Sequence, residues 1–194
     1  GDRFVNIGPF VKAKRTEKGM TISDLASASG VSAGMLSESE SGKKCPTIRV
    51  VQQIAVGLDC QISELLDLPP AVRHETVRKG AGKVLLDPET GVTRELLSPS
   101  LVRRGVQVLK WRIPVGASTG EFAPEAPGIM EHVTVFQGRV ELVIDGTPII
   151  LETGDSFTCA ADVTHEARNI GDEEAEFMLL VVTPRPGEVV AMGV

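Results

Sequence analysis

The sequence predicts an α + β protein with two domains, a helical domain followed by one built of strands. Up to about residue 66, apolar residues recur at helical spacing, and glycine or proline separates the segments. From about Val84, short apolar runs alternate with turns such as Asp145–Gly146, a pattern typical of β-hairpins. Pro69–Pro70 and a glycine-rich stretch stand between the two patterns. The predicted boundaries are therefore 1–70 for the helices, 71–83 for a linker and 84–194 for the strands.

The composition indicates a globular chain without a membrane segment. Hydrophobic residues make up 42% of the 194 residues, which is enough for real cores, yet no apolar run reaches the roughly 18 residues of a spanning helix. The first residues show no charged stretch followed by an apolar one, as a secretory signal would. Cys45, Cys60 and Cys159 form no close pair and no disulfide framework, so we expect a cytoplasmic, reducing location.

Five short helices are expected in the first domain. They fall at about 10–18, 22–29, 32–39, 47–56 and 62–66. Thr21 or Ser23 caps the second helix, and Ser32 caps the third. Gly30 forms the turn between them because glycine adopts backbone conformations that other residues resist, and the small Ala26 lets the two helices approach.

The second and third helices carry a helix-turn-helix pattern. Its residues are Leu25-Ala26, Gly30-Val31-Ser32, Leu36-Ser37, Glu40-Ser41-Gly42 and Pro46. This string resembles the Xre/phage-repressor helix-turn-helix family, with the match running over residues 10–66. The resemblance implies that the third helix enters the major groove of double-stranded DNA.

The same resemblance implies which residues contact DNA. The base-reading positions are Ala33, Gly34, Ser37 and Glu38. The phosphate contacts are Ser32, Ser41, Lys43 and Lys44, with help from the basic first helix. Thr21, at the start of the second helix, is also expected to contact DNA. Ala33 could touch a thymine methyl group, and Glu38 could accept a hydrogen bond from cytosine N4. Because few of these side chains can hydrogen-bond to bases, DNA shape is expected to carry part of the specificity.

The net charge of the helical domain is also compatible with a partner other than DNA. Residues 1–70 hold eight Lys or Arg and eight Asp or Glu, and the excess of acidic residues in the whole chain lies in residues 71–194. A nucleic-acid-binding domain is expected to be basic on its contacting face. A domain without net charge is compatible with DNA binding through local lysines, and also with an interaction module that binds protein instead.

The second domain is expected to be a β-sandwich or a small barrel. Strands are predicted at about 106–113, 133–136, 140–144, 149–151, 156–159 and 176–182. Within them, Glu131 is followed after six residues by Gly138, and Gly154, His165 and Asn169 stand at the spacing of a second box. This pattern resembles the cupin family over about residues 84–184, which implies a jelly-roll β-barrel.

The cupin resemblance implies a metal site of three histidines and one glutamate. Glu131 takes the glutamate position and His165 the position of the last histidine, while the paired histidines are absent. Glu125 stands nearby and could replace one ligand, so Glu125, Glu131 and His165 are the candidate metal ligands, for iron, manganese, nickel or zinc. The favoured alternative is a pocket without a cofactor that binds an organic ligand. Its candidate residues are Trp111, Arg112, Phe122, Glu125, Glu131, Phe157, His165 and Arg168.

These observations together predict a ligand-responsive transcriptional regulator that is not an enzyme. The helix-turn-helix is expected to bind a palindromic operator as a homodimer, and the barrel to bind a small polar metabolite that changes operator binding. Two other classes stay open. One is a metal-dependent cupin enzyme, such as a dioxygenase or isomerase, with an accessory helical domain, and the other is the protein-binding module described above.

Overall fold

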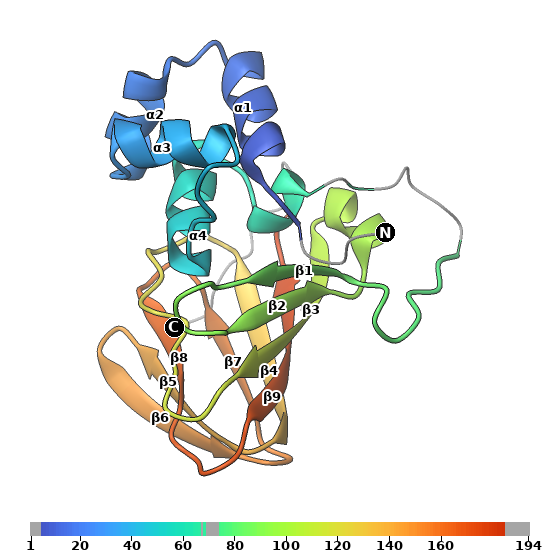
Figure 1. The fold of residues 1–194 in the computed structure, drawn as a ribbon. Coiled ribbons are helices and arrows are strands. Elements are labelled where there is room, and N and C mark those ends of the chain that lie inside the picture. Colours follow the sequence, from blue (N-terminus) through green and yellow to red (C-terminus); the bar gives the residue numbers. More distant parts are fainter. Residues whose placement is uncertain (1–4, 67, 69–73, 185–194) are drawn as a thin grey trace.

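The computed structural model describes residues 5–66, 68 and 74–184, with helices first and strands after them (Figure 1). The helices of the first domain are α1 (Gly8–Glu17), α2 (Ile22–Ser29), α3 (Ala33–Glu40), α4 (Ile48–Gly57) and the 3-10 helix η1 (Ile62–Leu65). They confirm the five helices expected from the sequence. The fifth is a short 3-10 helix instead of an α-helix.

Side-chain caps determine where α2 and α3 begin. At the start of α2, Thr21 Oγ1 accepts from the backbone N–H of Asp24 at 3.1 Å, and Asp24 Oδ2 accepts from the backbone N–H of Thr21 at 2.8 Å. This reciprocal pair is a capping box, so Thr21 is the N-cap of α2. Ser32 caps α3 by accepting from the N–H of Met35. Gly30 lies between the helices with a φ of 69°, the left-handed conformation that glycine adopts at little cost.

The helical domain is held together by an apolar core and one ion pair between helices. Leu25, Leu36 and Ile54 are fully buried and bring α2, α3 and α4 together. Arg15 of α1 donates to both carboxylate oxygens of Glu40, at 2.7 and 2.9 Å, which ties α1 to the end of α3. The helix α3 is thereby fixed to the rest of the domain by a partly buried salt bridge.

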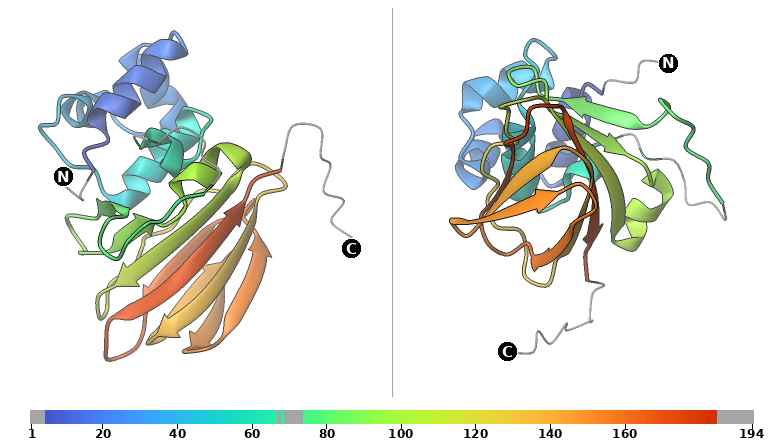
Figure 2. Two further views of the ribbon diagram at one scale, coloured as in Figure 1. Left: turned by 90° about the vertical axis from the view of Figure 1, so that its right-hand side faces the viewer. Right: turned by 90° about the horizontal axis from the view of Figure 1, so that it is seen from below.

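Two antiparallel sheets form the second domain. The strands are β1 (Lys83–Leu86), β2 (Thr93–Leu96), β3 (Val106–Ile113), β4 (Met130–Gln137), β5 (Arg139–Ile144), β6 (Thr147–Glu152), β7 (Ser156–Ala160), β8 (His165–Asn169) and β9 (Ala175–Val182). One sheet has the order β1-β2-β3-β9-β4-β7 and the other the order β6-β5-β8. The two sheets face each other around a shared core and make a barrel (Figure 2).

The six predicted strands are present, and the structure adds three more. β1, β2 and β8, together with the 3-10 helix η2 (Pro99–Arg104), were not assigned from the sequence. The expected hairpin at Asp145–Gly146 joins β5 to β6, with φ values of 47° and 74° at the two turn residues. Among the described residues, no helix is both long and apolar enough to cross a membrane.

The helical domain rests against the barrel through α4 and η1 (Figure 1). Gln52 of α4 donates through Nε2 to the carbonyl of Ala123 at 3.1 Å, and the backbone N–H of Ile48 donates to Asp87 Oδ2 at 3.2 Å. Buried apolar side chains of both domains form one continuous cluster. The barrel therefore provides part of the packing surface for the helical domain.

Candidate functional site

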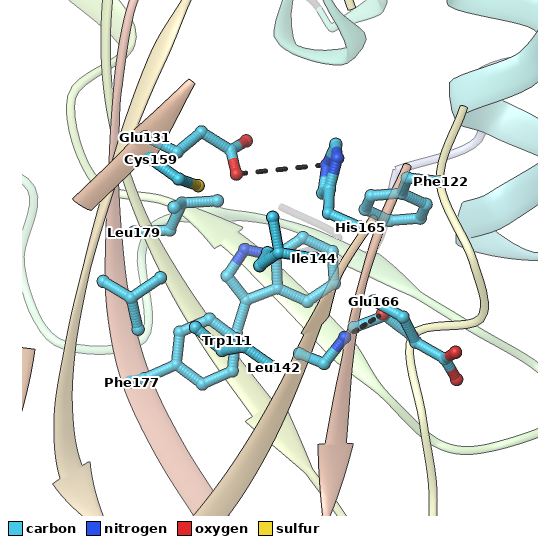
Figure 3. A pocket seen from close by; sticks show the side chains of 13 residues that line it. Trp111, Phe122, Glu131, Leu142, Ile144, Cys159, His165, Glu166, Phe177 and Leu179 are labelled. Carbon is cyan, nitrogen blue, oxygen red and sulfur yellow. Dashed lines mark hydrogen bonds and ion pairs between the residues drawn. The ribbon is translucent and has the colours of Figure 1, made fainter. Parts of the chain in front are cut away.

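A pocket lies inside the barrel, between the two sheets (Figure 3). Its volume is about 50 Å³, several times the roughly 10–15 Å³ that one water molecule needs. Most of its walls are apolar or aromatic. The lining residues are Trp111, Thr119, Phe122, Glu131, Val133, Leu142, Ile144, Cys159, His165, Glu166, Ala167, Phe177 and Leu179. Residues from both sheets and from the loop before β4 contribute, so the pocket exists only once the barrel has closed.

Strand alternation brings the aromatic residues to the pocket. Along β3 every second residue is buried, which turns Trp111 inward, and Phe177 stands opposite it on β9. The rings of Trp111 and Phe177 stack with centroids 6.2 Å apart, and Phe122 packs at 6.0 Å from Trp111 on another side. The buried indole N–H of Trp111 has no hydrogen-bond partner among the described residues, so the wall carries a free donor.

Glu131 and His165 are the two polar groups that converge in the pocket (Figure 3). Glu131 Oε2 lies 3.9 Å from His165 Nε2, too far for a direct hydrogen bond. His165 Nδ1 lies 3.0 Å from the carbonyl oxygen of Val163. Because a carbonyl oxygen only accepts, Nδ1 must carry the proton, and in the neutral ring Nε2 is then an acceptor. With Glu131 ionised and the His165 ring neutral, two acceptors therefore point into one small space.

Burial makes Glu131 an unusual carboxyl group. Removal from water is the largest effect on the pKa of Glu131 and raises it; His165 and Arg94 lower the pKa, the charge of Glu125 raises it, and the net value is about 7. The side chain is only 8% exposed. The protonation state of this carboxyl group is consequently sensitive to any donor or cation that enters the pocket.

The described residues do not fit the metal site that the cupin resemblance implies. Within the described part of the chain, no group of three histidine, cysteine, aspartate or glutamate side chains is arranged to hold a metal ion. Glu131 and His165 supply two ligands, whereas catalytic zinc sites use three protein ligands. Glu125, the expected third ligand, lines a cleft between the domains and accepts from Gln61 Nε2 at 3.0 Å.

The structure brings together only some of the ligand residues proposed from the sequence. Trp111, Phe122, Glu131 and His165 line the pocket. Arg112 lies on the opposite face of β3 from Trp111 and pairs with Glu176 at 2.9 Å.

The other expected ligand residues also lie outside this pocket. Arg168 follows the inward-facing Ala167, so its side chain points outward, where it pairs with Glu141 and Glu166. Phe157 packs against the hydrophobic core without lining the pocket. Selection by residue type alone therefore predicted too many polar residues in the pocket. Alternation along the strands places the side chains of Arg112 and Arg168 on the outer surface.

Several pocket residues were not selected from the sequence. Leu142 and Ile144 come from β5, and Phe177 and Leu179 from β9. In each pair the two residues are two positions apart and therefore share a face of the strand. Once Glu131 and His165 are placed inside the barrel, the alternation of inward-facing and outward-facing residues along β5 and β9 would have identified these four residues.

The second cupin box also contains residues that only support the barrel. Asn169 is buried and donates through Nδ2 to the carbonyl oxygens of Ile113 and Glu173, at 2.8 and 2.7 Å. It joins β8 to β3 and to the turn before β9. His132, next to Glu131, points to the outer face, where Nδ1 lies 2.7 Å from Thr158 Oγ1.

The residues expected to contact DNA are all exposed. They are Thr21, Ser32, Ala33, Gly34, Ser37, Glu38, Ser41, Lys43 and Lys44. Thr21 and Ser32 stand at the N-termini of α2 and α3, where backbone N–H groups favour phosphate. Two basic residues of α1 have other partners, since Lys14 pairs with Glu64 and Arg15 with Glu40. The help expected from the basic first helix is reduced accordingly.

Comparison with known proteins agrees with this arrangement of a DNA-binding domain and a barrel. The helix-turn-helix family matches residues 11–65, and the cupin domain family matches residues 109–183. The chain belongs to the HTH-type transcriptional regulators that carry a C-terminal cupin domain. It is 30% identical over 178 residues to the HTH-type transcriptional regulator SutR of Escherichia coli (strain K12), covering 90% of this chain and 93% of SutR.

Two further relatives are similar to this chain. The crystal structure of an HTH_3 family transcriptional regulator from Vibrio cholerae has a TM-score of 0.77 at 23% identity, covering 93% of this chain and 96% of that one. This likeness confirms the fold. Protein SchB of Streptomyces halstedii is 32% identical over 123 residues, which cover 62% of this chain and 77% of SchB.

Proposed function

We propose that this transcriptional regulator responds to a small molecule bound in the barrel pocket. The observation that carries the proposal is the pair of polar groups, Glu131 and His165, inside a largely apolar pocket of the barrel beside the helical domain. Phe122, which packs edge-on against the His165 ring at 5.5 Å, is followed directly by Ala123, the residue that binds Gln52 of α4. A residue that lines the pocket is thus the direct chain neighbour of a residue in contact with the helical domain.

The pocket chemistry indicates what kind of molecule binds. Two acceptors 3.9 Å apart suit one group that donates two hydrogen bonds, such as a protonated amine. The free indole N–H of Trp111 suits an acceptor on the same ligand. The remaining walls are hydrocarbon and aromatic rings, which favour an apolar body. The ligand is therefore a small amine or amide with an apolar portion, bound without a metal, and the protein has no catalytic role.

On the DNA side, we propose that α3 enters the major groove. Ala33, Gly34, Ser37 and Glu38 contact bases, and Ser32, Ser41, Lys43, Lys44 and Thr21 contact the backbone. Because this set offers few hydrogen bonds to bases, affinity depends on two copies of the helix binding half-sites one turn of DNA apart. The functional form is consequently a homodimer on a palindromic operator. Ligand acts by favouring one arrangement of the two reading helices over another.

Selection from random DNA tests this function. The full chain should enrich one palindromic sequence, with binding that weakens steeply as salt increases. Native mass spectrometry of freshly purified protein should show a dimer with a retained small molecule, and adding that molecule to stripped protein should change operator affinity roughly five-fold or more.

His165→Ala provides the discriminating control. The variant should bind the operator as the parent protein does and lose both the retained molecule and the ligand response. Ser37→Ala should have the opposite effect, with weaker operator binding and an unchanged ligand. Enrichment of no sequence, or a stoichiometric metal ion in place of an organic ligand, would contradict the proposal.

A further inference from the structure

Arg94 is a buried arginine between the pocket and the helical domain. It lies on β2 directly opposite Trp111 of β3, and facing residues of an antiparallel pair share one face of the sheet. The residue is 4% exposed, yet no carboxylate forms a salt bridge with it among the described residues. A buried guanidinium without a paired carboxylate is costly, so this position calls for an explanation.

The partners of Arg94 reach across the domain boundary. Arg94 Nη2 donates to Ser63 Oγ of η1 at 3.0 Å and to Gln107 Oε1 of β3 at 3.1 Å. Ser63 Oγ also donates to Gln107 Oε1, and Ser63 is completely buried. These three side chains fasten η1 to the barrel.

The network continues to the loop before β4. Gln107 Nε2 donates to Gln61 Oε1 at 3.1 Å, and Gln61 Nε2 donates to Glu125 Oε2 at 3.0 Å. Residues of the helical domain and of the barrel therefore alternate along one chain of hydrogen bonds. At its other end the buried Nη1 of Arg94 has no hydrogen-bond partner in the described structure.

Charge connects Arg94 to the pocket. Burial lowers the pKa of Arg94, while the carboxylates of Glu125 and Glu131 favour its charged form, and the net pKa is about 10. The effect is mutual, because Arg94 favours the ionised form of Glu131. When Glu131 is neutralised, the guanidinium group of Arg94 loses part of the electrostatic attraction that stabilises it in the buried position where it donates a hydrogen bond to Ser63.

We propose that Arg94 is a positioning residue that couples the pocket to the DNA-binding domain through η1. Neutralising Glu131, by a ligand donor group or by substitution, weakens the hold of Arg94 on Ser63 and loosens η1 and α4 from the barrel. This coupling rests on the proposed ligand response. It adds the path by which a change in the pocket reaches the helical domain. Its test needs no ligand, so it succeeds or fails independently of whether a ligand is found.

The experiment is a double-mutant cycle read by hydrogen exchange of the full chain at pH 8, where Glu131 of the parent protein is largely ionised. Glu131→Gln should speed exchange that occurs through local opening of α4 and η1 roughly five- to tenfold in peptides covering these helices, while exchange that needs global unfolding does not become faster. In an Arg94→Met background, which keeps most of the side-chain volume, the same substitution should have less than about a twofold effect. Matched controls are Glu141→Gln and Arg112→Met, which remove the same charges from the outer side of the barrel.

Ser63→Ala keeps the test decisive should Arg94→Met not fold. It removes the hydroxyl group on η1 and leaves Arg94 in place, and it should abolish the response to Glu131→Gln in the same way. Equal effects of Glu131→Gln in all backgrounds would overturn the proposal, as would no effect in the parent protein. Either result would place the coupling elsewhere, for example at Phe122 and Ala123.

Discussion

Glu131 is the residue at which burial and charge compete most directly. Its carboxyl group is enclosed by hydrocarbon, and the nearest basic group, His165, is 3.9 Å away. A carboxyl group in such a place prefers to be neutral unless a donor or cation approaches it. Burial of this carboxyl group therefore makes Glu131 a liability for the stability of the barrel.

Replacement of Glu131 by glutamine should reveal this liability as a dependence of stability on pH. The folded pKa is about 7, above the ordinary value of 4.5. Between these values the folded state holds a proton that the unfolded state has lost, so stability falls as pH rises and the loss is complete above pH 7. At pH 8, Glu131→Gln should be more stable than the parent protein by about 1–3 kcal/mol in urea unfolding, and the two should converge near pH 4.5.

The control is Glu121→Gln, which removes a charge from an exposed position. Its pH profile should run parallel to that of the parent protein. A constant difference between Glu131→Gln and the parent protein from pH 4.5 to pH 8 would show that the Glu131 carboxyl group titrates normally in the fold.

At the level of elements, the turn between α2 and α3 determines the position of α3. Gly30 has a left-handed backbone, and a Cβ atom added there would meet no neighbour within 4 Å. Any effect of a side chain at this position therefore comes from the backbone conformation alone. Gly34, within α3, has the same open space for a Cβ atom, but its backbone is helical.

These two glycines give opposite predictions for the same substitution. Gly30→Ala should lower the free energy of unfolding by about 1 kcal/mol because an L-residue is strained in the left-handed region. Gly34→Ala should raise it by roughly 0.5 kcal/mol because alanine favours helix. Chemical denaturation measures both. Stabilisation by Gly30→Ala would contradict the assigned turn geometry.

Elements with a strong local signal could be predicted from the sequence. The caps, the glycine turn and the Asp145–Gly146 hairpin depend on neighbouring residues, so the pattern alone identifies them. β2 and β8 are short, and their residues include charged side chains that mask the apolar alternation. The long-range partners of Arg94 carry no local signal, since Ser63 and Gln107 stand 31 and 13 residues away.

For the candidate site, the sequence predicted the two central polar residues and part of the aromatic wall. Glu131 and His165 were found because their box spacings are specific. Arg112 and Arg168 were chosen for their charge, although each is next to an inward-facing neighbour and must itself face outward. Which side of a strand a residue occupies depends on register, and the register becomes known only when the partner strands are known.

At the level of the whole molecule, the two domains share one packing surface. The hydrophobic cluster runs without interruption from the helices into the barrel, and buried polar bonds cross the boundary beside it. Two domains joined in this way are expected to unfold together, whereas domains joined only by a linker unfold separately.

Cooperative unfolding can be measured with two signals that report on different domains. The single tryptophan, Trp111, lies inside the barrel, while the α-helices belong to the helical domain. Tryptophan fluorescence and far-ultraviolet circular dichroism should give coincident thermal transitions. Transitions separated by more than about 5 °C, a shift typical of about 1 kcal/mol in a small domain, would show that the shared surface contributes little.

The contacts of α4 and η1 with the loop before β4 also bear on how the protein is made. Gln52 and Ala123 are 71 residues apart, and Gln61 and Glu125 are 64 apart. Ribosomes add roughly 5–20 residues per second, so the helical domain emerges about 3–13 seconds before the loop that it rests against. During that interval the side of α4 that carries Gln52 lacks its contact with the barrel. The speed of synthesis through residues 60–125 is therefore expected to affect the yield of correctly folded regulator.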